Sequence, residues 1–103
     1  MQNILLQKAG NIMEKSEIKA CLIKFKERTF AIIEVNRDII DDEAKALAFI
    51  KQHSFLFPRH PIVLISFHTN GKPILYGKPE LIDLLMLLKI EKIPWKIYRY
   101  QKR

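Results

Sequence analysis

The sequence predicts a small α+β domain whose strands and helices follow the order ββαββαβ. The chain has 103 residues, its apolar share is 49%, and two segments of helical composition separate short apolar runs of strand type. A chain of this length is typical of one domain. We expect residues 13–103 to form that domain and residues 1–12 to be a flexible extension, because Met13 resembles a natural start.

Two strands open the domain. Residues 20–26 alternate between apolar and polar side chains, which is typical of a half-exposed strand. Residues 30–35 are apolar on both sides except at Glu34, which suits a central strand. Glu27-Arg28 is short enough for a tight turn, although it lacks the glycine or asparagine that such turns prefer.

A helix is expected over residues 43–53, where apolar side chains recur at helical spacing. A carboxylate just before a helix accepts hydrogen bonds from the free N–H groups of the first turn. The acidic cluster of the chain lies at this position, so we interpret it as capping rather than as an acid–base pair. Its members are Asp38, Asp41, Asp42 and Glu43, with Asp41 or Asp42 as the cap.

The second half of the chain gives the clearest pattern. Residues 62–67 form a buried strand, Asn70-Gly71 favours a tight turn, and residues 74–76 pair back. Pro79 suits the first turn of a helix, because its missing N–H group has no partner there in any case.

Without its first strand, this order is βαββαβ, the order of the ferredoxin-like plait. We therefore expect a two-layer sandwich, a ferredoxin-like plait with an extra N-terminal strand, whose strands at 29–35 and 62–67 are parallel. Both strands are apolar on two faces, whereas a plait leaves one sheet face exposed. A partner subunit or a third layer must then cover the second face.

The segment 61–88 also resembles the C-terminal half of the thioredoxin fold. Pro61 precedes the buried strand, and the Asn70-Gly71 turn, the second strand, Gly77 and a leucine-rich helix follow. The resemblance implies a thioredoxin-like domain as the alternative fold. Cys21 has no second cysteine two residues away, so the implied protein is redox-inactive.

The helix that begins at Glu80 is apolar around nearly its whole circumference. A domain of this size has few places to bury such a helix on all sides. We therefore expect a two-fold homodimer, with burial inside the chain's own domain as the alternative. The expected interface consists of Leu81, Leu84, Leu85 and Leu88.

The last residues combine aromatic and basic side chains on an expected strand over residues 95–100. The net charge is +7, and six basic residues and one acidic residue lie from Lys89 onward. Aromatic faces stack on bases, and lysine and arginine contact phosphates. The candidate nucleic-acid-binding residues are Lys96, Tyr98, Arg99, Tyr100, Lys102 and Arg103. The same pattern is typical of an edge strand that anchors its aromatic rings in the core and points its lysines outward.

The sequence contains no recognisable catalytic or metal-binding set. Cys21 lies on the apolar side of its strand, as a buried structural cysteine does. His53, His60 and His68 do not cluster with a second type of metal ligand, and no phosphate-binding or dinucleotide motif occurs. We expect a protein that is not an enzyme and needs no cofactor or metal.

These patterns indicate a small homodimeric binding or adaptor protein with a protein partner. Nucleic-acid binding through the basic C-terminal segment is the alternative function. The chain has one cysteine, no signal-peptide pattern and no apolar run of membrane-spanning length, so we expect a cytoplasmic location without membrane contact.

Overall fold

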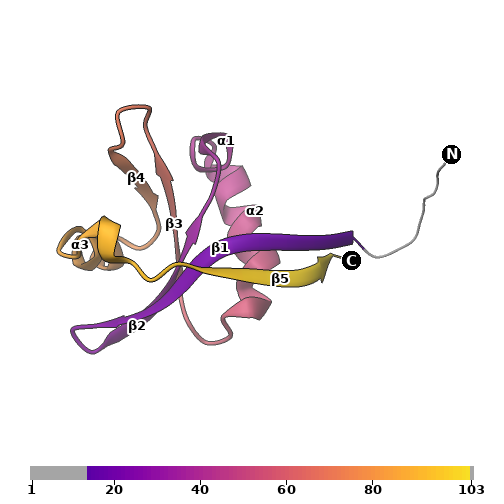
Figure 1. The fold of residues 1–103 in the computed structure, drawn as a ribbon, viewed down its shortest axis with the longest axis horizontal. Helices are drawn as coiled ribbons and strands as arrows, with labels where there is room; N and C mark the ends of the chain where they lie inside the picture. The colour runs from indigo at the N-terminus through magenta and orange to yellow at the C-terminus, as the bar shows by residue number, and fades with distance from the viewer. Residues whose placement is uncertain (1–13, 103) are drawn as a thin grey trace, which may run out of the picture.

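The computed structural model describes residues 14–102, which form an α+β domain with a five-stranded mixed sheet and three helices (Figure 1). The predicted extension at residues 1–12 and the predicted nucleic-acid contact Arg103 lie outside the described residues. The strands are β1 (Glu14–Phe25), β2 (Arg28–Glu34), β3 (Ile62–Phe67), β4 (Pro73–Tyr76) and β5 (Lys96–Lys102). The helices are α1 (Arg37–Ile40), α2 (Glu43–His53) and α3 (Pro79–Met86), with 3₁₀ turns η1 (Ser54–Leu56) and η2 (Ile90–Lys92).

The strand order corrects the predicted plait. The order across the sheet is β4-β3-β2-β1-β5. β2 and β3 are parallel, as predicted, but they are direct neighbours, whereas a ferredoxin-like plait separates its corresponding strands by another strand. β1 pairs with one edge of β2 in a hairpin, so only the opposite edge of β2 is open to another strand, and β3 pairs there.

The domain has three layers rather than the predicted two. Alternate side chains of β2 point to opposite faces of the sheet. Ala31 and Ile33 pack with Ala46 of α2, while Phe30 and Ile32 pack with the buried leucines of α3. The chain therefore covers both apolar faces of its central strands with its own helices.

The thioredoxin-like alternative is also wrong, because that fold requires a helix between the first two strands. Here the turn contains only Lys26 and Glu27, which lie between the paired residues Phe25 and Arg28. Both turn residues have positive φ angles, 51° and 68°, so a tight hairpin turn forms without glycine.

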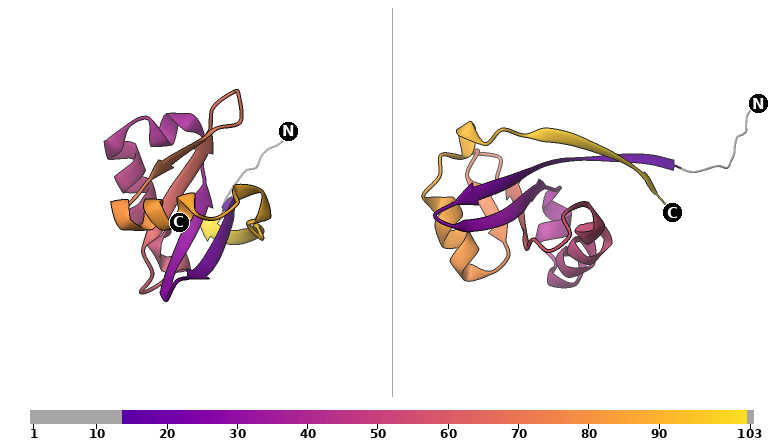
Figure 2. Two further views of the ribbon diagram at one scale, coloured as in Figure 1. Left: turned by 90° about the vertical axis from the view of Figure 1, so that its left-hand side faces the viewer. Right: turned by 90° about the horizontal axis from the view of Figure 1, so that it is seen from below.

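β1 is longer than the predicted strand at 20–26, and it serves two partners. Its second half pairs with β2, and its first half, from Glu14 to Ala20, pairs with β5. β1 and β5 therefore run together past the end of β2 as a two-stranded ribbon (Figure 2). The residues of β1 before Ala20 were not predicted as strand, because their partner β5 is remote in the sequence.

The two main helices begin as predicted. The Asp42 side chain accepts hydrogen bonds from the N–H groups of Ala44, at 2.9 Å, and Lys45, at 3.3 Å, which confirms it as the cap of α2. Pro79 lies in the first turn of α3. α3 ends at Met86, so it is too short to cover the whole sheet face on its side.

Candidate functional site

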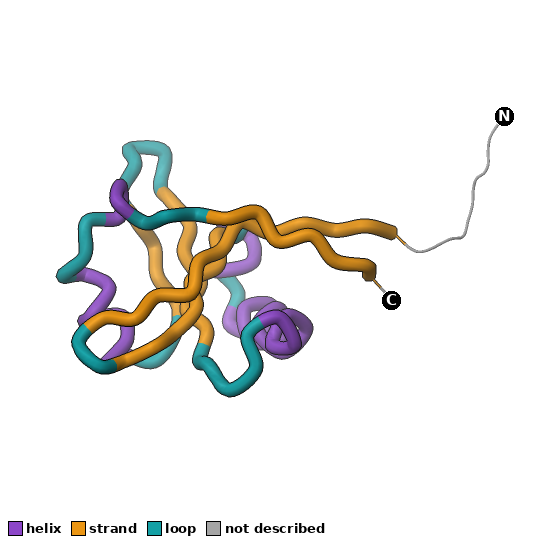
Figure 3. Tube along the Cα trace, turned by 60° about the horizontal axis from the view of Figure 1, so that its bottom comes forward, coloured by secondary structure: helices purple, strands orange, loops and turns teal. Residues whose placement is uncertain are grey.

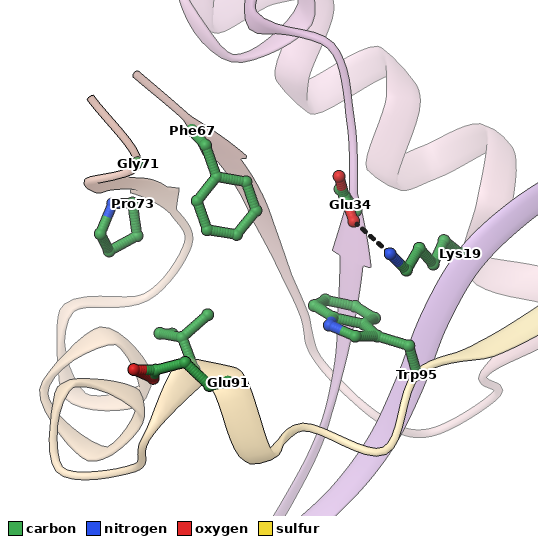
Figure 4. Close-up of a pocket in the computed structure, with 8 residues that line it drawn as sticks. Lys19, Glu34, Phe67, Gly71, Pro73, Glu91 and Trp95 are labelled. Carbon is green, nitrogen blue, oxygen red and sulfur yellow. Dashed lines mark ion pairs between the residues drawn. The ribbon is translucent and has the colours of Figure 1, made fainter. Parts of the chain in front are cut away.

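The part of the sheet face that α3 does not cover contains an open pocket of about 440 Å³ (Figure 4). It lies where β2 and β3 end, and the turn η2 forms its outer rim. Its lining comes from β1 to β4, the β3–β4 loop, η2 and the residue just before β5. The lining residues are Lys19, Glu34, Phe67, Gly71, Pro73, Ile90, Glu91 and Trp95.

An ion pair crosses the floor of the pocket. Lys19 and Glu34 are directly opposite each other in the β1–β2 register. Lys19 Nζ lies 3.4 Å from Glu34 Oε1, and the two side chains are 49% and 34% exposed. At that exposure the pair contributes only about 0.2–1 kcal/mol to stability. Both charged groups therefore stay accessible to a ligand.

Two aromatic rings also line the pocket: Figure 4 shows the Trp95 ring next to the ion pair and the Phe67 ring farther from Lys19. Both are half-buried against the core on the α3 side of the sheet. The backbone N–H group of Trp95 donates a hydrogen bond of 2.9 Å to the backbone carbonyl of Ile93, which fixes the chain just before β5. Lys19 Nζ lies 5.7 Å from the centroid of the Trp95 ring, within the range of a cation–π contact.

The β3–β4 loop and η2 approach each other at the rim, although they are remote in sequence (Figure 3). Gly71 has a φ angle of +87°, and its N–H group donates a hydrogen bond of 2.9 Å to the carbonyl of His68. His68 in turn donates from its N–H group to the carbonyl of Lys72. A left-handed glycine in a three-residue hairpin loop is a common arrangement, and here it places Pro73 on the pocket wall.

The position and composition of the pocket match two general features of ligand pockets. β2 and β3 are the parallel pair of the sheet, and ligands of open α/β sheets bind outside the carboxyl ends of parallel strands. Aromatic walls with a few placed charges are typical of ligand pockets. Glu91 is an exposed residue of η2 on the opposite side of the pocket from the ion pair (Figure 4).

The four leucines of the predicted interface differ in their burial. Leu81 and Leu85 are fully buried in the chain's own core, so they offer no surface to a partner. Leu84 and Leu88 are half-buried. The exposed apolar side chains at this end of α3 are Met86, at 67%, and the following Leu87, at 63%.

The predicted nucleic-acid-binding residues lie on β5, at one edge of the sheet. Tyr98 and Tyr100 pack against the core on the α2 side, as expected for an edge strand that anchors its aromatic rings. Lys96 and Arg99 are exposed, and Arg99 Nε lies 3.2 Å from a carboxylate oxygen of Glu17. Lys102 ends β5, and its partner in the register is Glu14.

The remaining candidate residues do not assemble into a reactive site. Cys21 is buried, as predicted, and burial raises the pKa of its thiol despite the opposing effect of Lys96. His53 is buried at the end of α2, whereas His68 is exposed. Among residues 14–102, no three histidine, cysteine or acidic side chains come together as metal ligands, and no helix is long and apolar enough to cross a membrane.

Comparisons of the chain with protein-family models, with curated proteins and with solved structures find no match. The site therefore rests on its own geometry. None of the pocket residues was predicted from the sequence as a functional residue. The pairing of Lys19 with Glu34 in the hairpin register was the one local signal that could have indicated it.

Proposed function

We propose that this chain is a small binding protein without catalytic activity, and that a ligand or a partner's side chain occupies the pocket beside Trp95. One observation carries the proposal. An open cavity at the carboxyl ends of the parallel strands β2 and β3 is lined by two aromatic rings and an ion pair from distant parts of the chain. A rigid sheet positions most of these groups, which favours recognition.

Nuclear magnetic resonance tests this proposal with two matched variants. We expect members of a chemically mixed fragment set to shift the amide signals of Glu34, Phe67 and Trp95 in the unmodified protein. Ile90→Phe enlarges a half-buried side chain that lines the pocket and should abolish those shifts, whereas Lys92→Phe, two residues further along η2, should preserve them. If no fragment shifts the pocket signals, the proposed site is wrong.

We further propose that the adaptor role involves a homodimer. Support comes from Met86 and Leu87, two large apolar side chains that are mostly exposed at the end of α3, beside the half-buried Leu84 and Leu88. Contiguous apolar surface of this kind marks interaction sites. The cytoplasmic location remains an expectation that rests on the single cysteine.

Nucleic-acid binding is the alternative proposal, and it is supported by the exposed Lys96 and Arg99 on an edge strand. Because the rings of Tyr98 and Tyr100 pack on the core, such binding would depend on phosphate contacts more than on base stacking. It predicts a shift with single-stranded oligonucleotides at low salt that weakens steeply as salt rises and is reduced in Lys96→Gln. A titration at low salt without any shift would rule it out.

A further inference from the structure

We propose that the ligand of the pocket is an organic cation, an ammonium or guanidinium group carried by a free amine or by a basic side chain. This inference rests on the proposed binding function and specifies its ligand. Three observations support it: the charges that line the pocket, the position of the Lys19 ammonium, and the placement of the Trp95 ring.

The charged lining of the pocket is acidic, although the chain as a whole is basic. The lining contains two carboxylates, Glu34 and Glu91, but only one cation, Lys19. The net charge of the whole chain is +7. Among the lining residues, carboxylates therefore outnumber cations, in contrast with the chain as a whole.

Lys19 shows that the pocket stabilises an ammonium group. Its Nζ atom lies both within 3.4 Å of a Glu34 oxygen and 5.7 Å from the centre of the Trp95 ring. A carboxylate combined with an aromatic face is the environment that recognises alkylammonium ligands. Lys19 thus acts as an internal occupant of the cation site.

Lys19 can leave that position at little energetic cost. Its side chain is about half exposed, and a surface ion pair of this kind contributes only about 0.2–1 kcal/mol. An external cation could then take the position between Glu34 and Trp95, which Figure 4 shows next to the Lys19 ammonium group. Lys19 therefore competes with the ligand for that position, and the two positive charges repel each other.

The chain provides its own probe of this site, since Trp95 is its only tryptophan. We would titrate the full chain with tetramethylammonium chloride at constant ionic strength and record Trp95 fluorescence. Sodium pivalate and tert-butanol serve as anionic and neutral probes of similar shape. We expect saturable binding of the cation, with a dissociation constant on the order of millimolar for so small a probe, and no saturable change with the other two.

A second pair of probes distinguishes a free amine from a basic side chain. The blocked peptide acetyl-Gly-Lys-Gly-amide is compared with the same peptide carrying norleucine in place of lysine. Tighter binding of the lysine peptide than of tetramethylammonium would identify a basic side chain as the ligand. Tighter binding of tetramethylammonium would identify a small free organic cation. In both cases the norleucine peptide should not bind, and equal binding of the lysine and norleucine peptides would contradict a cation site.

Three variants test the role of charge. Lys19→Met removes the internal competitor and should tighten binding of tetramethylammonium roughly two- to five-fold, whereas Glu34→Gln removes the carboxylate of the site and should weaken binding by a similar factor. The matched control is Glu27→Gln, which lies in the exposed β1–β2 turn and should bind as the unmodified chain does. Circular dichroism and thermal melting establish that each variant is folded.

Different outcomes overturn the inference and the proposed function. If pivalate or tert-butanol saturates the Trp95 signal as well as the cation does, or if Lys19→Met weakens cation binding, the pocket binds a ligand of another class and the cation inference is wrong. If no probe of any charge binds, and fragments leave the pocket signals unchanged, the proposed function fails as well.

Discussion

The Tyr100 hydroxyl donates a hydrogen bond of 2.6 Å to Nε2 of His53, although the two residues lie 47 positions apart. Nδ1 of His53 lies 2.8 Å from the carbonyl oxygen of Phe49, which can only accept, so Nδ1 carries the proton in the neutral ring. The His53 ring also stacks on the Phe49 ring, at 3.9 Å between centroids. The hydrogen bond between Tyr100 and His53 connects the β1–β5 ribbon to the last turn of α2.

Replacing Tyr100 by phenylalanine should lower the free energy of unfolding by about 1–3 kcal/mol, because His53 Nε2 would remain buried without a partner. Urea denaturation of Tyr100→Phe, His53→Leu and the double variant measures the coupling between the two residues. The double variant should lose less stability than the sum of the single variants. Simple additivity would show that the hydrogen bond contributes nothing.

Stability should fall as the solution becomes alkaline. Burial raises the pKa of the Cys21 thiol above 9.0 and that of the Tyr100 hydroxyl above 10.0, and burial together with the Glu43 carboxylate raises the pKa of Tyr76. The unfolded chain therefore loses these protons at lower pH than the folded chain does. The stabilising effect is complete below the unfolded pKa values and is lost as the pH rises through the folded ones.

Urea midpoints measured from pH 8 to 11 would check this dependence. We expect them to decrease above about pH 9, with a smaller decrease in Cys21→Ala than in the unmodified chain between pH 9 and 10. Midpoints that stay level up to pH 11, or that rise, would contradict the assignment of raised pKa values.

The β1–β2 turn stores backbone strain that a glycine should relieve. Glu27 has a φ angle of 68°, and this conformation costs an L-residue about 1–2 kcal/mol. Glycine avoids that cost, but it loses more conformational entropy on folding, so only part of the difference appears as added stability. Glu27→Gly should therefore raise the free energy of unfolding by about 0.5–1 kcal/mol. Glu27→Ala keeps the strain, so thermal melting should show little change for this control; equal gains in both variants would exclude a backbone cause.

The proposed homodimer should depend on the end of α3. Sedimentation velocity at micromolar concentration should show a dimer for the unmodified chain and a monomer for Met86→Ser/Leu87→Ser. Leu47→Ser is the matched control, because Leu47 is an apolar residue of α2 that is 47% exposed, and this variant should remain dimeric. A monomeric unmodified chain would end the proposal.

The sequence predicted the elements well where the determining contacts are local. The cap at Asp42 and the helix after it depend on neighbouring residues, and so does the strand at 62–67. The strand order depends on pairing between remote segments. Only the fold shows that β5 pairs with the first half of β1 and that α3 supplies a third layer.

The pocket was not predicted because its key pair depends on the position of a turn. With the turn at Lys26-Glu27, Lys19 lies opposite Glu34. The expected turn at Glu27-Arg28 would instead pair Lys19 with Asn36, which separates the two charges. When a hairpin turn shifts by one residue, each residue of the first strand faces a partner two positions further along the second strand. The side chains that face each other in the pocket therefore cannot be predicted when the position of the turn is predicted wrongly.

We expect the pocket lined by Phe67 and Trp95 to bind a ligand, and nuclear Overhauser contacts within a complex test this expectation. With tetramethylammonium at saturating concentration, we predict contacts between its methyl protons and the ring protons of both Trp95 and Phe67. Contacts with other aromatic rings, such as Phe55 and Tyr100 on the α2 side of the sheet, without any contact to Trp95, would contradict the claim.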